Sequence, residues 1–511
     1  MRGLTVLTLG VGVALTVGAY GQAVSPAPST SPLQVLLVGG GPEPNLNQAA
    51  IESNIRYLSH LMPSNANVTT LFANGSLTTP TVLARAAVTQ NDAANMLYST
   101  IQDHVVMEPS DSFRKPQLPG GVSGAATSSV FRAKLQALGD NYRAGTAAGP
   151  LLLYFTGHGG PTNREYSNNI YAMWRPSPPL SVTDFATDLR VIPRNVPVYV
   201  VMVQCFSGGF ANLIFKGGEE GAPVTDRPLA GFFASTSSTE AAGCTAAIDE
   251  KYYPDFTSFF FSALTGRNRV GQKVTGADFR HDGKITMAEA YDYTIANDPT
   301  IDIPTCTSDM FLRRFVPDRD SDVFMLPRIL VKSWATPGQL AALNILERKI
   351  GFHGKHPVTA LYNMMTTLKS PTMPVIGVRK TVKRFDGLAS NEFQMLRHRF
   401  PGLTSKNDAR RRSATARAVA WIGKNYHDSA LQAVLRASHE GDNLQETAAE
   451  QFALRVRYLR LFKSIFLAHK LMQTGEPDVQ ARFAELMKAE DSTPLPPAAG
   501  WAEPQTATLT R

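Results

Sequence analysis

The chain has 511 residues, of which 43% are hydrophobic and 18% are charged, and its formal net charge is +8. This balance is typical of a globular protein of two or three domains and excludes a disordered or fibrous chain. Residues 331–490 hold 25 Lys and Arg against 13 Asp and Glu, so this part carries +12 and the remainder −4. The basic part is suited to contact with an anionic envelope surface or with the acidic remainder of the chain. The alternative is that the basic residues simply lie on solvent-exposed helix faces.

The N-terminus has the pattern of a secretory signal peptide. Arg2 precedes an apolar run that ends in small residues near Gly21 and Ala23, and a Pro/Ser-rich segment follows. We therefore expect a signal peptide over 1–23, a linker over 24–32 and a secreted or periplasmic mature chain. An uncleaved membrane anchor is the alternative that the length of the run permits. Nucleic acid is not expected as a partner of an exported protein.

Apolar strands alternate with helical patterns in the part that follows. The expected strands are 33–38, 67–73, 150–156, 196–204 and 229–236. Helical patterns begin near Asn47 and cover 128–145, and Ser181 with Asp184 is a capping pair for another helix. Near-continuous apolar strands separated by helices predict an α/β fold with a mainly parallel sheet that is covered on both faces.

The rest of the chain divides into an insertion, a helical domain and a tail. Polar, Pro/Gly-rich sequence at about 74–127 predicts a surface insertion within the α/β domain. Past Thr336-Pro337 the pattern becomes helical, so we expect an all-α C-terminal domain over 335–490. Its long amphipathic stretches are 405–425, 427–439 and 443–473. Residues 491–511 have the composition of a disordered tail.

Two reactive side chains follow consecutive strands of the predicted sheet. His158 lies in "LLLYFTGHGG" just past the third strand, and Cys205 lies in "VMVQCFSGGF" at the end of the fourth, 47 residues later. Open parallel sheets bind ligands beyond the carboxyl ends of their strands, so both side chains are expected at one edge. Together they are the parts of a cysteine nucleophile and its general acid/base. Each residue alone is more often a structural group, and their joint placement favours catalysis.

The neighbours of the two side chains add detail to this hypothesis. The stretch "FSGGFANLIF" after Cys205 predicts a tight turn into a helix, whose N-terminus would favour a thiolate. Glycines beside His158 would let a substrate backbone lie close to the imidazole. The backbone N–H groups of Gly159 and Cys205 are the candidate oxyanion donors.

The chain has three cysteines, Cys205, Cys244 and Cys306. An odd count in an exported chain leaves one thiol free. Cys244 and Cys306 are the candidate disulfide pair in an oxidising compartment, and Cys205 would then be the free thiol.

A separate stretch, "DFRHDGKITMAE" (278–289), follows the pattern of a calcium-binding EF-hand loop. Its candidate ligands are Asp278, Asp282, Lys284 (through its carbonyl) and Glu289. Arg280 stands at a ligand position, where it cannot bind a metal and adds positive charge. Two interpretations of this stretch remain open: a structural or regulatory calcium site, and a loop that keeps the EF-hand turn without binding metal. Catalysis is expected to require no cofactor.

The His158 and Cys205 motifs resemble those of caspase/legumain-type cysteine peptidases. The Tyr-Phe-Thr before His158 is similar to legumain's histidine strand, and a histidine about 50 residues before the cysteine is the caspase arrangement. The stretches "STEAAGCTAAIDEKYY" and "NQAAIESNIRYL" also resemble legumain, with the bacterial members of the group as the best comparison. The resemblance covers roughly 33–320 and implies a caspase-like three-layer sandwich over 33–330.

The resemblance implies a cysteine-type endopeptidase that acts on a peptide or protein substrate, with Cys205 as nucleophile and His158 as general acid/base. It places the substrate pocket at Asn47, Phe206, Ser237 and Asp249. Phe206 stands where legumain has an acidic residue, and Leu46-Asn47 replaces an Arg-His pair. We therefore do not expect strict asparaginyl specificity.

Three alternatives remain open at this point. The C-terminal domain would cap the active site, as legumain's helical segment does until its removal, or it would serve as a constitutive support or a dimer interface. The same dyad would serve a transpeptidase or transamidase, which passes the acyl group to an amine. A catalytically inactive peptidase fold that binds or scaffolds other proteins is the third alternative.

Overall fold

The structure is a computed structural model that describes residues 31–84, 94, 97–98, 100–101, 112–162, 165–246, 253–316, 323–367 and 376–498. The expected signal peptide, most of the expected linker and residues 499–511 of the expected tail lie outside the described residues, as does Asp249. Among the described helices, none combines the length and the apolar character that a bilayer-spanning segment needs.

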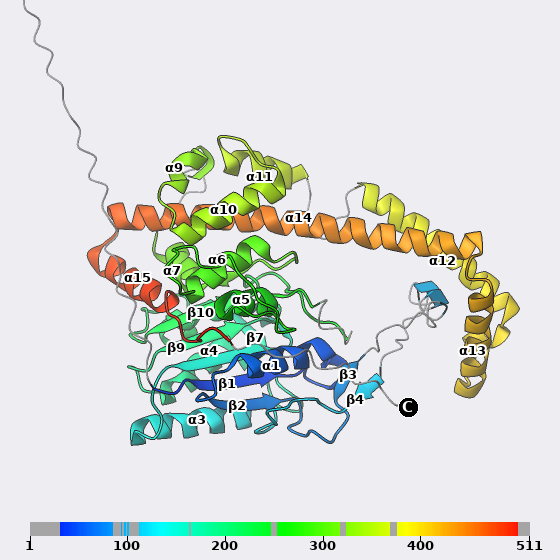
Figure 1. The fold of residues 1–511 in the computed structure, drawn as a ribbon, viewed down its shortest axis with the longest axis horizontal. Coiled ribbons are helices and arrows are strands. Elements are labelled where there is room, and N and C mark those ends of the chain that lie inside the picture. The colour runs from blue at the N-terminus through cyan, green and yellow to red at the C-terminus, as the bar shows by residue number, and fades with distance from the viewer. Residues whose placement is uncertain are drawn as a thin grey trace, which may run out of the picture.

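A six-stranded, mainly parallel sheet forms the centre of the α/β part (Figure 1). Its strands are β1 (Gln34–Gly39), β2 (Asn67–Phe72), β5 (Leu151–Thr156), β9 (Val198–Met202), β10 (Leu229–Phe233) and β11 (Thr305–Cys306). They lie in the order β11-β10-β9-β5-β1-β2, and only β11 is antiparallel to its neighbour. The five predicted strands are confirmed, and four of them are fully buried apolar runs, whereas β2 is buried only over its second half. β11 has only two residues and shows no such pattern.

The strand order reverses between β1 and β5. From β1 the chain moves to β2 on one side, and it then returns to β5, β9 and β10 on the other side. In open α/β sheets, the crevice for ligands forms at the carboxyl ends of the strands beside such a reversal. The sheet therefore presents its candidate binding edge where β1 and β5 end, next to the end of β9.

Helices cover both faces of the sheet. One face carries α1 (Ala49–Leu61), α5 (Phe256–Thr265) and α6 (Met287–Asn297). The other carries α3 (Ser128–Ala144), α4 (Val182–Asp188), the 3-10 helix η4 (Ser207–Ile214) and α7 (Thr307–Phe315). Alternate residues of β1 serve the two cores, since Val35 faces the first set and Leu36 the second. Ser181 and Asp184 form the predicted capping box of α4.

A second, smaller sheet stands beside the carboxyl edge. It consists of the antiparallel strands β6 (Gly159–Thr162), β7 (Glu165–Tyr171) and β8 (Leu180–Ser181). β6 begins directly after His158, so this sheet forms one border of the candidate site. The sequence analysis did not predict β7, because its largely polar residues lack an apolar run.

The expected insertion at about 74–127 is tied to the C-terminal helices. A short hairpin pairs β3 (Val82–Ala84) with β4 (Ser112–Arg114). Between these strands, Leu97, Tyr98 and Ile101 are buried against residues of α12 and α13. The described part of the insertion is therefore not simply a surface loop.

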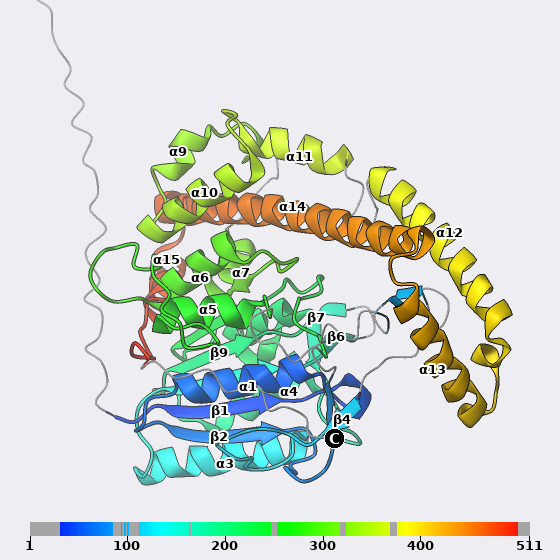
Figure 2. The same cartoon turned by 45° about the vertical axis from the view of Figure 1, so that its right-hand side comes forward.

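The C-terminal part is helical, as the sequence predicts. It contains α9 (Arg328–Lys332), α10 (Pro337–Ile350), α11 (Pro357–Thr367), α12 (Ile376–Arg399), α13 (Asp408–Lys424), α14 (Ser429–Thr474) and α15 (Pro477–Glu490). α14 is a single helix of 46 residues that joins two predicted stretches across Gly441. One glycine costs a helix only about 1 kcal/mol, which is too little to end it. Figure 2 shows α14 spanning the molecule, with α12 and α13 at its N-terminal end.

This helical part shares its packing with the sheet. Leu471 of α14 and Phe483 of α15 belong to the same core as β5 and β9. Residues 491–498 also pack, although they were expected in a disordered tail: Leu495 is buried in the core on the opposite face, and the Ala498 N–H donates to the Thr265 carbonyl at 2.9 Å. The end of the described chain is therefore part of the α/β structure, because its apolar side chains complete both cores.

Glu490 gives a direct test of this shared packing. Its buried carboxylate accepts hydrogen bonds from Thr307 Oγ1 at 2.6 Å and from Ser308 N and Ser308 Oγ at 2.7 Å. Glu490→Ala should lower the free energy of unfolding by about 2–4 kcal/mol, because three buried donors lose their acceptor. Urea denaturation measures this change. The control Glu485→Ala, at an exposed position of α15, should change stability by about 0.5 kcal/mol or less. Equal midpoints for the two variants would contradict the shared core.

Candidate active site

His158 follows β5, and the loop after β1 holds its imidazole. Nε2 lies 2.8 Å from the Leu46 carbonyl oxygen and 3.0 Å from Gln48 Oε1. Because a carbonyl oxygen can only accept, Nε2 carries hydrogen, and Nδ1 is then the basic nitrogen of the neutral ring. Burial lowers the pKa of His158 and outweighs the opposing bond to Leu46. The neutral imidazole is therefore favoured near neutral pH.

Asn47, an expected pocket residue, instead supports this loop. It is fully buried, and its Oδ1 accepts from the Gly41 N–H at 3.3 Å while its Nδ2 donates to the Thr81 carbonyl at 2.9 Å. A Cβ atom on Gly41 would lie only 1.8 Å from the Leu46 oxygen, so the tight loop requires glycine there. The Asn47 amide is thus buried and stabilises the loop that orients His158.

Cys205 lies three residues past the end of β9 and is half-buried. The Ala241 N–H donates to its sulfur at 3.3 Å, and the thiol lies 3.7 Å from the Ala241 carbonyl oxygen. Burial raises the pKa of Cys205, with the Ala241 backbone opposing it and the charges of Glu240 and Asp302 adding to it. The thiol form is therefore favoured over the thiolate that the sequence predicted.

The difference arises from the turn that follows Cys205. The predicted helix is the 3-10 helix η4, and Phe206 stands before it with φ of 60°. An N–H group that donates to the sulfur belongs to Ala241, in a loop distant in sequence, and the Cys205 N–H itself also lowers the thiol pKa. Individual backbone groups thus take the place of the helix N-terminus that was expected to stabilise a thiolate.

Gly159, which follows His158, packs against the backbone of Cys205. β5 pairs in parallel with β9, so residues 158 and 205 follow adjacent strands at one edge. A Cβ atom on Gly159 would lie 2.4 Å from the Cys205 oxygen, whereas one on Gly160 would meet nothing within 4 Å. The Cys205 N–H makes no hydrogen bond to the backbone of another described residue and acts on its own sulfur, so it remains the candidate oxyanion donor.

Cys244 brings a second thiol into the site. Cys244 is exposed at the surface, but its sulfur lies 3.9 Å from His158 Nδ1, and local desolvation with the neighbouring Cys205 raises the pKa of its thiol. All three cysteines are free, so the expected Cys244–Cys306 disulfide is not formed. Cys306 is instead buried in β11, with its sulfur 3.2 Å from Ser308 Oγ. Sequence spacing cannot show which cysteines meet, because β11 and the Cys244 loop are placed by tertiary contacts.

His158 and Cys205 are therefore connected through one loop. No described hydrogen bond joins their side chains directly. Ala241 contacts the Cys205 sulfur, and Cys244, three residues later, contacts His158 Nδ1. We refer to residues 241–244 as the bridging loop.

Two of the expected pocket residues lie together beside Cys205. Asn169 of β7 donates through Nδ2 to the carbonyls of Phe206 at 2.7 Å and Ser237 at 2.8 Å. The Phe206 ring stacks on Tyr166, with 6.4 Å between ring centroids. Asn169 and Tyr166 were not predicted as site residues, because β7 has no apolar run that would mark it as a strand. The available signal was their place in the same short segment that follows His158.

The EF-hand-like loop keeps its turn without gathering metal ligands. Glu289 accepts from the N–H groups of Phe279 and Arg280 and caps α6 with Thr286. The Arg280 guanidinium also lies 3.2 Å from Glu289 Oε2. No group of metal-ligating side chains is found within the described part of the chain. With a guanidinium on Glu289, this arrangement does not fit a calcium ion.

The carboxylates expected to bind calcium instead hold the backbone of that loop. Asp278 accepts from the N–H groups of Asp282 and Gly283, and Asp282 accepts from the Lys284 N–H at 2.9 Å. The loop is thus closed by its own hydrogen bonds.

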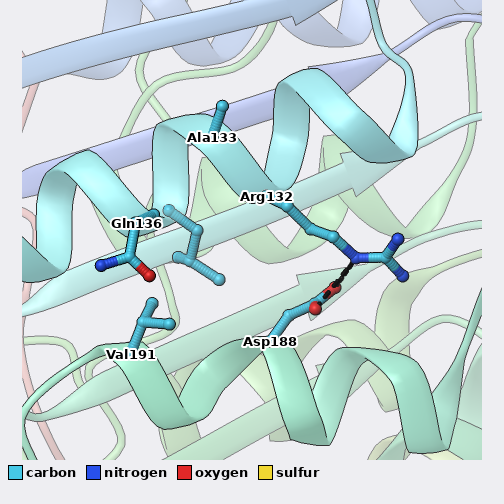
Figure 3. A pocket seen from close by; sticks show the side chains of 6 residues that line it. Arg132, Ala133, Gln136, Asp188 and Val191 are labelled. Carbon is cyan, nitrogen blue, oxygen red and sulfur yellow. Dashed lines mark hydrogen bonds and ion pairs between the residues drawn. The ribbon is translucent and has the colours of Figure 1, made fainter.

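A separate surface pocket lies on elements that carry neither His158 nor the cysteines (Figure 3). Its lining residues are Arg132, Ala133, Leu135, Gln136, Asp188 and Val191. Arg132 and Asp188 neutralise each other across it, with 3.0 Å between Nε and Oδ1. The pocket offers no reactive group beyond this ion pair.

Comparisons with known proteins leave the family open. No protein-family model matches the chain, and no curated protein does. A crystal structure of a protein from Geobacter sulfurreducens is 12% identical and covers 54% of this chain and 92% of that chain, with a TM-score of 0.28. A likeness at this level carries no argument about fold or function.

The state of the Cys205 thiol can be measured directly. Because burial raises its pKa, iodoacetamide labelling of Cys205 should have a pH midpoint above the free-thiol value of about 8.5. Peptide mass spectrometry separates Cys205 from the other cysteines, and the unfolded chain in urea is the reference. A midpoint below that of the unfolded chain would show a stabilised thiolate and contradict this assignment.

The two glycines after His158 provide a matched pair of variants. Gly159→Ala places a Cβ against the Cys205 carbonyl and should cost about 1–3 kcal/mol of stability. Gly160→Ala enters open space and should change stability by about 0.5 kcal/mol or less. Thermal and urea unfolding measure both changes. Equal effects would show that Gly159 does not pack against Cys205.

Proposed function

We propose that the chain is an exported cysteine endopeptidase of the caspase/legumain type, with Cys205 as nucleophile and His158 as general acid/base. The observation that carries this proposal is the convergence of both residues at one sheet edge, with Gly159 packed against the Cys205 backbone. The mainly parallel sheet covered on both faces supports the caspase-like part of the proposal. The substrate is a peptide or protein.

The first half of the proposed reaction begins from a neutral thiol and a neutral imidazole. When a peptide carbonyl enters, His158 Nδ1 takes the Cys205 proton while the sulfur attacks the carbonyl carbon. The N–H groups of Gly159 and Cys205 receive the developing oxyanion. His158 then returns the proton to the leaving amine, and a thioester to Cys205 remains.

In the second half, water replaces the amine product. His158 Nδ1 removes a proton from water, which attacks the thioester carbonyl, and the proton passes to the departing Cys205 sulfur. The Leu46 carbonyl accepts a hydrogen bond from Nε2 throughout and favours the imidazolium that forms in each half. Nδ1 faces Cys244 before substrate binds, so the cycle requires the bridging loop to adjust. Catalytic hydrogen bonds often tighten only in the substrate complex.

The helical C-terminal part is proposed to be a constitutive support rather than a removable cap. Its α14 and α15 complete the core beneath β5 and β9. A segment that is released on activation would not leave its apolar side chains in the core of the mature enzyme.

The nucleophile can be identified with paired cysteine variants. Cys205→Ala should reduce hydrolysis of a mixed peptide library by at least about a thousandfold, because no acyl-enzyme forms. Cys244→Ala removes the sulfur nearest His158 and should leave at least about a tenth of the activity. Product analysis by mass spectrometry, with and without an added amine, separates hydrolysis from acyl transfer. Loss of activity in Cys244→Ala alone would reassign the nucleophile.

The pH profile tests the role of His158. Burial lowers its pKa below 6.5, and the neutral ring is the base, so kcat/KM should remain high at pH 6.5 and fall only at lower pH. His158→Ala should lose most of the activity and the acid limb together. An acid limb with a midpoint above 6.5 would contradict a base held neutral by burial.

A further inference from the structure

We infer that Arg457 of α14 is a positioning residue for the candidate active site and that it acts through Asp302 on the bridging loop. This inference rests on the proposed function of Cys205 and His158. It extends that function to a residue about 250 positions away in sequence, in a helix that contributes no reactive group.

Arg457 anchors α14 to the turn between α6 and β11. Its side chain is buried. Its guanidinium donates three hydrogen bonds to backbone carbonyls of this turn. Nε donates to Asp302 at 2.5 Å, Nη1 to Asp298 at 2.5 Å and Nη2 to Thr300 at 2.7 Å. A buried guanidinium is tolerated when its donors are satisfied in this way. Because one planar group bonds three carbonyls, the 298–302 turn has little freedom to move.

Asp302 connects the 298–302 turn to the bridging loop through a hydrogen bond. Its carboxylate is fully buried and accepts from the Ala242 N–H at 2.6 Å and from the Phe256 N–H at 3.2 Å. Asp302 therefore fixes the bridging loop against the start of α5. A backbone shift of the 298–302 turn would move the acceptor of the Ala242 N–H directly.

The bridging loop contacts both reactive groups. The Ala241 N–H donates to the Cys205 sulfur, and the Cys244 thiol lies beside His158 Nδ1. The contacts therefore run without interruption from Arg457 through Asp302 and Ala242 to Cys205. Small displacements of reacting groups are costly in enzymes, and about 1 Å can reduce the rate a hundredfold.

Arg457 is also a cation close to two buried acidic side chains, Asp298 and Asp302. Burial raises the pKa of both Asp298 and Asp302, and the charge of Arg457 lowers each. The Arg457 guanidinium lies 3.9 Å from Asp298 Oδ2. Its removal would leave two buried acidic side chains without this nearby cation.

The test compares Arg457→Met with Arg455→Met. Arg455 lies on the same helix, and its recorded hydrogen bond is to the Gln451 carbonyl of α14 itself. Amide hydrogen exchange of the full chain, followed by mass spectrometry of the peptide that contains 241–244, reads the bridging loop without relying on catalysis. Peptides from β1 and β5 report general destabilisation in the same experiment.

Amide hydrogen exchange at 241–244 should be at least about tenfold faster in Arg457→Met than in Arg455→Met. Exchange in β1 and β5 should be equal in the two variants. The kcat/KM of Arg457→Met should fall by about tenfold or more, and Arg457→Lys should recover part of the loss. Asp302→Asn keeps one acceptor for the Ala242 N–H and should give an intermediate effect, so the relay remains testable should Arg457→Met not fold.

The inference is overturned if exchange at 241–244 is the same in Arg457→Met, Asp302→Asn and Arg455→Met. Faster exchange at 241–244 in a chain that hydrolyses no peptide would support the relay and count against the proposed peptidase function. Full activity with unchanged exchange would support the peptidase and count against the relay.

Discussion

The parallel pairing of β5 with β9 is the constraint on which the candidate site depends. Its register opposes Phe155 to Met202, so the two chains leave the sheet side by side at the same edge. The small sheet then starts at once from Gly159, which packs on the Cys205 backbone. Two unpaired loops would not stay together here, because ordering their backbones costs conformational entropy. In the paired strands, ladder hydrogen bonds already offset that cost.

The chemistry of the site follows from how closely it is packed. Burial lowers the pKa of His158 and raises the pKa of Cys205, which favours the neutral form of each group. Backbone groups contact both side chains. The Leu46 carbonyl holds the imidazole, and the Ala241 N–H holds the sulfur. In the proposed reaction, these loops position both reactive groups.

Much of the α/β architecture was predictable from local pattern. The apolar runs of the parallel strands and the capping residues Ser181 and Thr336 mark their elements without reference to the rest of the chain. The elements that were missed are short or polar, such as β11 and β7, and pairing with other strands stabilises them. The same limit applies to Asn169, whose contact with the Cys205 turn depends on where the tertiary structure places β7.

By itself, the sequence determined where the strands lie along the chain and that the C-terminal part is helical. It also marked His158 and Cys205 as candidate site residues. These are local properties, because they depend on periodicity and on position relative to the end of a strand. Tertiary structure alone decided that Cys244 lies beside His158 rather than pairing with Cys306, and that α14 and α15 complete the sheet's core. Thiol pairing, burial and the resulting pKa shifts depend on which surfaces meet, and that information is absent from spacing along the chain.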